Sequence, residues 1–240
     1  FFALLFVGSA TQKSAPSAPI HVATYDFKPP TVAEAKSSKI AFLLINPMYA
    51  RSFRYTGIKT FSDFSKAMSA DFNELLTAKG YSVRGPYDTY DAIIYSDKQE
   101  SDLMLSVEID LGINTDNVKW TSVYSMGYGG GQTSYKFAGD VILSGKVNLV
   151  ASETLTKEKL WAKSIPLEQR SIPVTSEKVY AQPQMFMRAF EVDAGLVNPV
   201  SAALEEFYTS TLNTAWNHLD PQELTPLKKQ VNEIREKKKY

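Results

Sequence analysis

The stretch DLMLSVEIDL, from Asp102 to Leu111, decides the fold class of this chain. Its apolar residues at every second position, from Leu103 to Leu111, alternate with polar residues and one methionine. Because successive side chains of a strand point to opposite faces, this alternation predicts a strand with one buried and one wet face. We therefore expect a sheet that helices cover on one side only.

Two further strands are predicted before this stretch and one shorter strand near the start. KIAFLLINP, from Lys39 to Pro47, is a nearly continuous apolar run, which is typical of a strand buried on both faces in the middle of a sheet. Tyr81–Arg84 is expected to lie parallel to it and to complete a β-α-β unit. HVATYDF, from His21 to Phe27, predicts a short strand closed by two prolines.

A helix is predicted between these strands, because apolar residues recur at helical spacing from Phe61 to Leu76. Thr60 and Asp63 have the spacing of an N-terminal cap, and Gly80 is a typical terminator. A second, short helix is expected from Asp88 to Tyr95.

The second half of the chain predicts an antiparallel meander of long hairpins with helices after it. The part between Glu168 and Asn198 stays open between a wrapped loop, an edge strand and a partner contact. The ending REKKKY is expected to be a solvated basic tail. The predicted strands are Val118–Tyr124, Tyr135–Ala151 and Lys159–Leu167, and the predicted helices begin at Asn198-Pro199 and at Thr225-Pro226. The fold class is therefore α+β, a two-layer sandwich of a mixed sheet, with an N-terminal β-α-β unit, an antiparallel meander and C-terminal helices.

Composition excludes several classes of function. The 240 residues contain 26 basic and 26 acidic side chains, so no overall charge favours nucleic acid. No cysteine and only two histidines are present, which leaves little material for a metal site or a nucleophilic triad. Glu108 and Asp110 are only about 7 Å apart along one strand face, and their apolar sequence neighbours belong to the opposite face, so the pair is not expected to act as general acid and base. We expect no catalytic residues, no metal and no cofactor.

The first 20 residues suggest export. Phe1–Val7 is apolar but too short to cross a bilayer, and it resembles the tail of a signal peptide. Ser9 stands where a bacterial lipoprotein has its lipid-accepting cysteine, whereas Gly8-Ser9-Ala10 also resembles a site for ordinary cleavage; a buried strand or a vector remnant are the alternatives. We expect a signal-like remnant over 1–10, a Pro/Ser/Ala linker over 11–20 and a single adhesin-like domain over 21–240.

Two loops contain candidate ligand-binding residues. After the buried strand, basic and aromatic residues alternate along the chain. The basic side chains could bind a carboxylate through two hydrogen bonds while an aromatic ring packs on a sugar face. The Tyr-, Ser- and Gly-rich stretch Thr121–Tyr135 resembles the composition of binding loops. A solvated loop and a flexible hairpin tip are the alternatives. The candidates are Arg51, Arg54, Tyr55 and Lys59 in the first loop, and Lys119, Tyr124 and Tyr128 in or beside the second.

Four stretches, KIAFLLINP, LLTAKGYSV, SDLMLSVEIDLGI and GDVILSGKVNLVASETLTKEKLWAKSIPLE, occur in an order that resembles the neuraminyllactose-binding haemagglutinin family, also called flagellar sheath adhesin A, of Helicobacter. The similarity runs from about Val22 to the C-terminal basic helix. It implies an outer-membrane or flagellar-sheath lipoprotein, with Gly8-Ser9 where the family has Gly-Cys. The family's proposed sialyllactose contact is a run of Lys and Arg, whereas Gly112–Trp120 offers only Lys119. Sialic-acid binding is therefore not carried over residue by residue, and a paralogue is expected.

The resemblance implies a non-enzymatic, adhesin-like binding protein with a role in virulence. The partners that it implies are a host glycan or glycoprotein, an envelope or flagellar-sheath protein, and the membrane through an N-terminal lipid. Without lipidation, the location would be the periplasm. The alternative is an envelope scaffolding module that docks a protein partner on an exposed sheet edge or on the segment Met185–Phe190.

Overall fold

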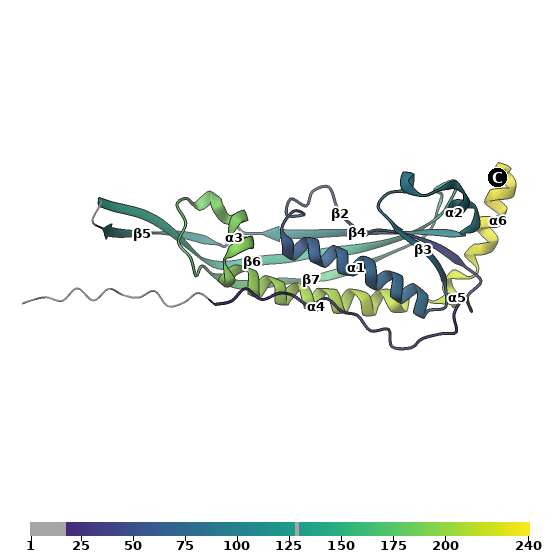
Figure 1. Cartoon of the computed structure of the whole chain (residues 1–240), viewed down its shortest axis with the longest axis horizontal. Coiled ribbons are helices and arrows are strands. Elements are labelled where there is room, and N and C mark those ends of the chain that lie inside the picture. Colours follow the sequence, from purple (N-terminus) through teal and green to yellow (C-terminus); the bar gives the residue numbers. More distant parts are fainter. Residues whose placement is uncertain (1–17, 128–129) are drawn as a thin grey trace, which may run out of the picture.

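The structure, a computed structural model, describes residues 18–127 and 130–240. It contains one mixed sheet and a layer of long helices on one face of the sheet (Figure 1). The strands are β1 (Ala41–Ile45), β2 (Met48–Tyr49), β3 (Ser82–Tyr87), β4 (Leu103–Asn114), β5 (Lys119–Gly127), β6 (Gly130–Glu153) and β7 (Lys159–Thr175). The helices are α1 (Lys59–Ala78), α2 (Tyr95–Glu100), α3 (Phe186–Val192), α4 (Ala194–His218), α5 (Pro221–Leu224) and α6 (Leu227–Lys238), with 3-10 turns η1 (Tyr90–Ala92) and η2 (Pro183–Met185).

The sheet combines the two halves that the sequence predicts. β1 lies between β3 and β4 and is parallel to both, and with α1 it forms the β-α-β unit. β6 pairs antiparallel with β4, β5 and β7. β4 and β5 follow one another along the same edge of β6, and β7 follows the other edge. The predicted α+β class and antiparallel meander are therefore confirmed.

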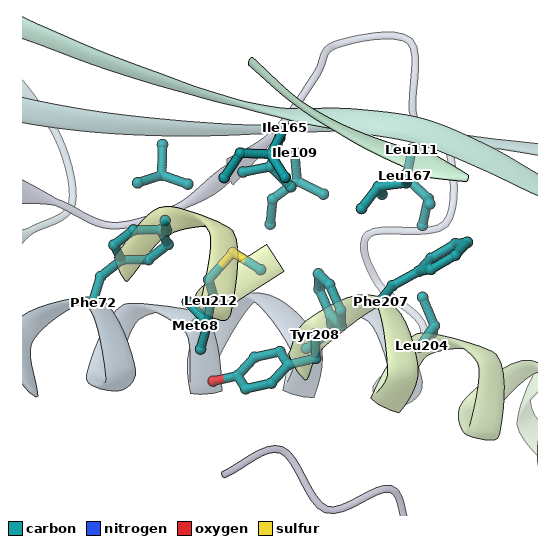
Figure 2. Close-up of a cluster of buried hydrophobic side chains, with 14 of the residues drawn as sticks. Met68, Phe72, Ile109, Leu111, Ile165, Leu167, Leu204, Phe207, Tyr208 and Leu212 are labelled. Atoms are coloured by element: carbon teal, nitrogen blue, oxygen red, sulfur yellow. The ribbon is translucent and has the colours of Figure 1, made fainter. Parts of the chain in front are cut away.

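The alternation in β4 has the predicted effect. Leu103, Leu105, Val107, Ile109 and Leu111 are all buried, whereas Glu108 and Gly112 on the other face are exposed. Figure 2 shows how side chains from α1 and α4 meet the buried faces of β4 and β7. Burying a large apolar side chain of this kind contributes about 1.5–3 kcal/mol. The labelled residues of this cluster are Met68, Phe72, Ile109, Leu111, Ile165, Leu167, Leu204, Phe207, Tyr208 and Leu212.

The opposite face of the sheet is covered only at one end. There, Ile93 packs with Leu43, Ile45 and Met104 in a small second cluster. This cluster explains why Met104, on the face predicted to be wet, is buried. The rest of this second face, which we call the open face, has no helix over it among the described residues.

The segment His21–Phe27 is not the strand that the sequence predicts. It is extended but lies along the helical layer, away from the sheet (Figure 1), and side chains of the helices accept its backbone N–H groups. Asn198 Oδ1 accepts from His21 (2.7 Å), Glu205 Oε1 from Thr24 (2.6 Å) and Asp71 Oδ2 from Phe27 (2.9 Å). The sequence pattern of His21–Phe27 predicts an extended backbone, but it does not show whether the N–H groups donate to helix side chains or to a neighbouring strand. We call this segment the strap.

Three predicted helix starts are wrong. Ile58, not Thr60, is the N-cap of α1, and it makes no side-chain cap. The range Asp88–Tyr95, predicted as a helix, contains only the 3-10 turn η1, and α2 begins at Tyr95; the Asp88 side chain accepts from the Asn46 side chain and caps no helix. α4 begins at Ala194, five residues before Pro199, because the Asp193 side chain caps it by accepting from Gly195 N–H (3.0 Å).

The open segment Glu168–Asn198 is edge strand only in its first part, up to Thr175, and its later part forms η2, α3 and the start of α4. β7 continues to Thr175 and pairs through Pro166 and Pro173 with β6. Proline is tolerated there because β7 is the last strand on its side and needs no outward hydrogen bond. After it, Phe186 and Phe190 of α3 pack edge-on against each other.

The predicted basic tail is partly buried. Glu153 is completely buried at the end of β6, and Arg235 of α6 donates to its carboxylate (2.8 Å), to Ser101 O (2.7 Å) and to Thr154 Oγ1 (2.7 Å). Burial would raise the pKa of Glu153, but hydrogen bonds from Thr156 N–H and Arg235 outweigh it and hold that pKa below the usual 4.5. We call this contact the C-terminal clamp.

Replacing Arg235→Ala leaves the Glu153 carboxylate buried without its cation, so we expect a loss of about 3–5 kcal/mol in the free energy of unfolding, measured with urea. Because the folded-state pKa of Glu153 is lowered, the clamp stabilises the fold above about pH 4.5, the ordinary glutamate value, and loses its effect as the pH falls through the folded-state pKa. The exposed Lys237→Ala is the control and should change stability by less than about 0.5 kcal/mol. Equal losses of stability in Arg235→Ala and Lys237→Ala would contradict a stabilising role for the C-terminal clamp.

The strap depends on Asp71, which is buried and accepts from both Phe27 N–H and the Tyr208 hydroxyl. Burial raises the pKa of Asp71 above the usual 3.8. Its ionisation therefore lowers stability as the pH rises from 3.8 through the folded-state pKa. Asp71→Ala should cost about 1–3 kcal/mol and speed chymotryptic cleavage at Tyr25 or Phe27. Asp71→Asn, which keeps an acceptor without a charge, should lose less free energy of unfolding. Equal rates of cleavage in the two variants would refute the role of Asp71 in holding the strap.

Candidate functional site

A polar row crosses the middle of the open face. The strand register places Glu108 of β4 beside Asn148 of β6, and Asn148 beside Ser164 of β7. Asn148 Nδ2 donates to Glu108 Oε1 (3.1 Å), and Ser164 Oγ donates to Asn148 Oδ1 (2.9 Å). These hydrogen bonds fix three polar side chains in one line across three strands.

The polar row forms the floor of a groove of about 670 Å³. β2 provides one wall, since Met48 pairs beside Glu108 and remains 55% exposed. Arg51 follows in the loop, which is tied to β4 by the hydrogen bond from Ala50 N–H to Ile109 O (2.9 Å). We call this the open-face groove; its volume lies within the range of small-ligand sites.

The charges around the open-face groove favour an anion with several hydroxyl groups. Arg51 and Lys159 contribute two exposed cations, against the single carboxylate of Glu108. Lys163 also lines the groove, but its amine pairs with Glu223 (2.8 Å). A guanidinium can bind a carboxylate through two parallel hydrogen bonds, and the polar row offers both donors and acceptors to hydroxyl groups.

The first loop's other candidates lie outside this groove. Arg54 is exposed and does not line it. Tyr55 is half-buried and packs against Phe53, Phe61 and Phe190, and burial raises its pKa. Tyr55 is therefore a packing residue.

Lys59 lies with the helical layer. It pairs with Asp63 one turn along α1 and lines a separate cavity of about 300 Å³, together with His21 and Tyr25 of the strap. The sequence placed Lys59 with Arg51 because they are eight residues apart, but the chain turns into α1 between them. The two cations line different cavities.

The second group of candidates lies on the hairpin of β5 and β6, which projects beyond the helical layer (Figure 1). Lys119 is exposed at the start of β5, and Tyr124 is 65% exposed farther along it. The ring of Tyr124 lies over Gly131 of β6, where a Cβ atom would come within 1.8 Å of the phenol oxygen. Tyr128 and Ser9 lie outside the described residues.

Sequence reasoning missed the partners of Glu108 in the polar row. Asn148 and Ser164 stand 40 and 56 positions after Glu108 and belong to no local motif. The alternation of side chains along each strand would have placed Asn148 and Ser164 on the polar faces of their own strands. Only the register between the strands brings them beside Glu108.

The described residues reveal neither a metal site nor a membrane helix. Over 18–127 and 130–240, no three His, Asp or Glu side chains gather in a way that could hold a metal ion. No helix in the same part of the chain combines the length and the apolar character needed to cross a bilayer.

The fold and the groove define a two-layer α+β protein with a ligand-sized polar groove on the open face of its sheet. It is similar in fold to the neuraminyllactose-binding haemagglutinin homologue from Helicobacter pylori, with a TM-score of 0.57, 15% identity, and coverage of 88% of this chain and 98% of the other. No family model matches the sequence, and no curated protein matches it.

Two weaker structural matches fall below a TM-score of 0.5, and we draw nothing from them. A Xanthomonas campestris protein has a TM-score of 0.37 and 14% identity, and covers 85% of this chain and 98% of its own. A lipoprotein from Neisseria meningitidis has a TM-score of 0.29 and 12% identity, and covers 68% of this chain and 99% of its own.

The different positions of Tyr55 and Arg51 predict different effects on stability. Tyr55→Ala removes a ring from the aromatic cluster and should lower the free energy of unfolding by about 2–4 kcal/mol. Arg51→Ala, on the exposed loop, should change it by less than about 0.5 kcal/mol. Urea unfolding of both variants checks this, and a large loss for Arg51→Ala would mean that Arg51 supports the fold.

Proposed function

We propose that this chain is a non-enzymatic protein of the bacterial envelope that binds an acidic sugar in the open-face groove. The observation that carries the proposal is the position of Arg51 beside the hydrogen-bonded row of Glu108, Asn148 and Ser164. A carboxylated sugar presents one anion and several hydroxyl groups, which match one guanidinium and a row of mixed donors and acceptors.

The fold likeness supports a binding role of the same general kind, because the Helicobacter pylori protein is described as a neuraminyllactose-binding haemagglutinin homologue. In this chain the proposed contact is different: Arg51 replaces the basic run that the family resemblance would place after β4. The sugar class is therefore proposed from the groove, and an adhesin-like role follows if the sugar belongs to a host surface.

The location is proposed from the N-terminal sequence. Phe1–Val7 and Gly8-Ser9 resemble a lipoprotein signal, and the Pro/Ser/Ala linker over 11–20 would hold an adhesin-like domain over 21–240 away from a membrane. We propose an exported protein of the outer membrane or flagellar sheath, or of the periplasm where no lipid is attached.

Binding of 3′-sialyllactose, measured by calorimetry and compared with lactose, tests the proposed function. We expect binding that needs the carboxylate, weakens with added salt, and falls at least about tenfold in Arg51→Ala, because a charge-assisted bidentate contact is lost. Arg54→Ala removes an equal charge three residues away, outside the groove, and is the matched control.

A glycan array extends the test to other acidic sugars. Retained binding in Arg51→Ala, or equal losses in Arg51→Ala and Arg54→Ala, would contradict the groove as the site. Failure of the wild-type chain to bind any acidic glycan on the array would contradict the function itself.

A further inference from the structure

The outer edge of β5 is an unpaired sheet edge. β5 bonds to β6 on one side only, and no described strand pairs with its other side. The neighbouring edge of β4 is covered by β1 and β2 only as far as the hydrogen bond from Ala50 N–H to Ile109 O. Every second residue of β5 therefore directs its backbone N–H and C=O outward, where no strand among the described residues pairs with them.

This edge lacks the protection that β7 and β3, two other edge strands of the same sheet, have. β7 contains Pro166 and Pro173 together with Arg170, and β3 contains Arg84 and Pro86. By contrast, the sixteen residues from Trp120 to Tyr135 include no charged side chain and no proline. Charges and prolines are the usual means of preventing strand pairing at an edge, so β5 is the edge that is open to it.

Apart from Lys119 at its start, β5 exposes only uncharged side chains. Val123 is 37%, Tyr124 65% and Met126 85% exposed. The ring of Tyr124 is held over Gly131, toward its own β6, and so leaves the outer backbone edge accessible. A two-stranded ribbon is only marginally stable by itself, and added strands would stabilise it.

We propose that β5 pairs antiparallel with β5 of a second copy of this chain, in a symmetric dimer centred on Val123. The sequence of β5 is complementary to itself in this register. Trp120 lies opposite the partner's Met126, Thr121 opposite the partner's Ser125, and Ser122 opposite the partner's Tyr124. Each larger side chain meets a smaller or more flexible one, and Lys119 does not meet the partner's Lys119.

The absence of charge favours a second copy over the other occupants. From Trp120 to Gly127 the edge carries no charge, so two identical edges meet there without like-charge repulsion, and this stretch offers no charge by which to select a different acidic or basic partner. A lipid surface would leave the free backbone groups of β5 without hydrogen bonds in the hydrocarbon layer. Pairing with another β5 satisfies them.

The shape of the molecule permits this dimer. The hairpin projects beyond α1 and α4 (Figure 1), and antiparallel pairing places the two helical layers at opposite ends of the joined hairpins. The tip of one hairpin then lies beside the root of the other, where Trp120 packs with Phe137, Tyr180 and Phe186. Met126 thereby gains an aromatic surface to cover.

The chain has no cysteine, so one introduced cysteine reports one contact. In Val123→Cys, the two thiols meet at the two-fold axis, and mild oxidation should give a disulfide-linked dimer in high yield. Val179→Cys is the matched control, because this valine is 56% exposed and lies outside the hairpin. It should give little disulfide-linked dimer. Equal yields for the two variants would overturn the proposal, because random collision would then explain both.

Sedimentation of the unmodified chain provides a second measurement. We expect a dimer that dissociates on dilution, with a dissociation constant raised at least about tenfold by Val123→Lys, which sets like charges opposite one another, and unchanged by Val179→Lys. Circular dichroism verifies that both variants fold. Three results would each overturn the proposal: a chain that stays monomeric, a dimer indifferent to Val123→Lys, or a dye on the thiol of the Val123→Cys variant that responds to phosphatidylcholine vesicles but not to protein concentration.

Discussion

Burial of a single face along a very long strand is the constraint on which this structure depends. β6 has 24 residues and spans roughly 80 Å, whereas the 25 residues of α4 span only about 37 Å. The helical layer therefore covers only part of the sheet's length. The alternation in β4 and β6 keeps apolar side chains under α1 and α4, and the clamp between Arg235 and Glu153 fixes the last helix at one end of β6.

Both proposed surfaces lie where the helical layer leaves the sheet uncovered. The open-face groove exists because no long helix among the described residues covers that face, so Glu108 and Asn148 can form a polar floor in reach of Arg51. The projecting hairpin exists because β5 and β6 continue past the helical layer. If two copies pair through β5, each assembly has two grooves, and binding to a surface rich in sugars gains avidity from the second groove.

The strong periodicities allowed much of the fold to be predicted. The run Lys39–Pro47, the helical stripe from Phe61 and the alternation from Leu103 each reflect a single, local burial pattern. The strap was mistaken for a strand because its acceptors, Asp71 and Glu205, lie far away in sequence. The site was harder to predict: Arg51 and Lys59 are close in sequence but line different cavities, and the pairing of Glu108 with Asn148 depends on strand register.

The claim that one sheet face is buried and the other is open to solvent can be tested with two alanines, one on each face of the sheet. Ala151 of β6 is fully buried under the helices, and Ala162 of β7 is exposed in the open-face groove, beside Val150. The rate at which a thiol reagent labels Ala162→Cys and Ala151→Cys in the otherwise cysteine-free chain measures access to each face directly. The account predicts rapid labelling of Ala162→Cys, and labelling of Ala151→Cys only as fast as the protein unfolds. Protection of Ala162→Cys comparable to that of Ala151→Cys would mean that the open face is covered, and would contradict both the fold's asymmetry and the groove.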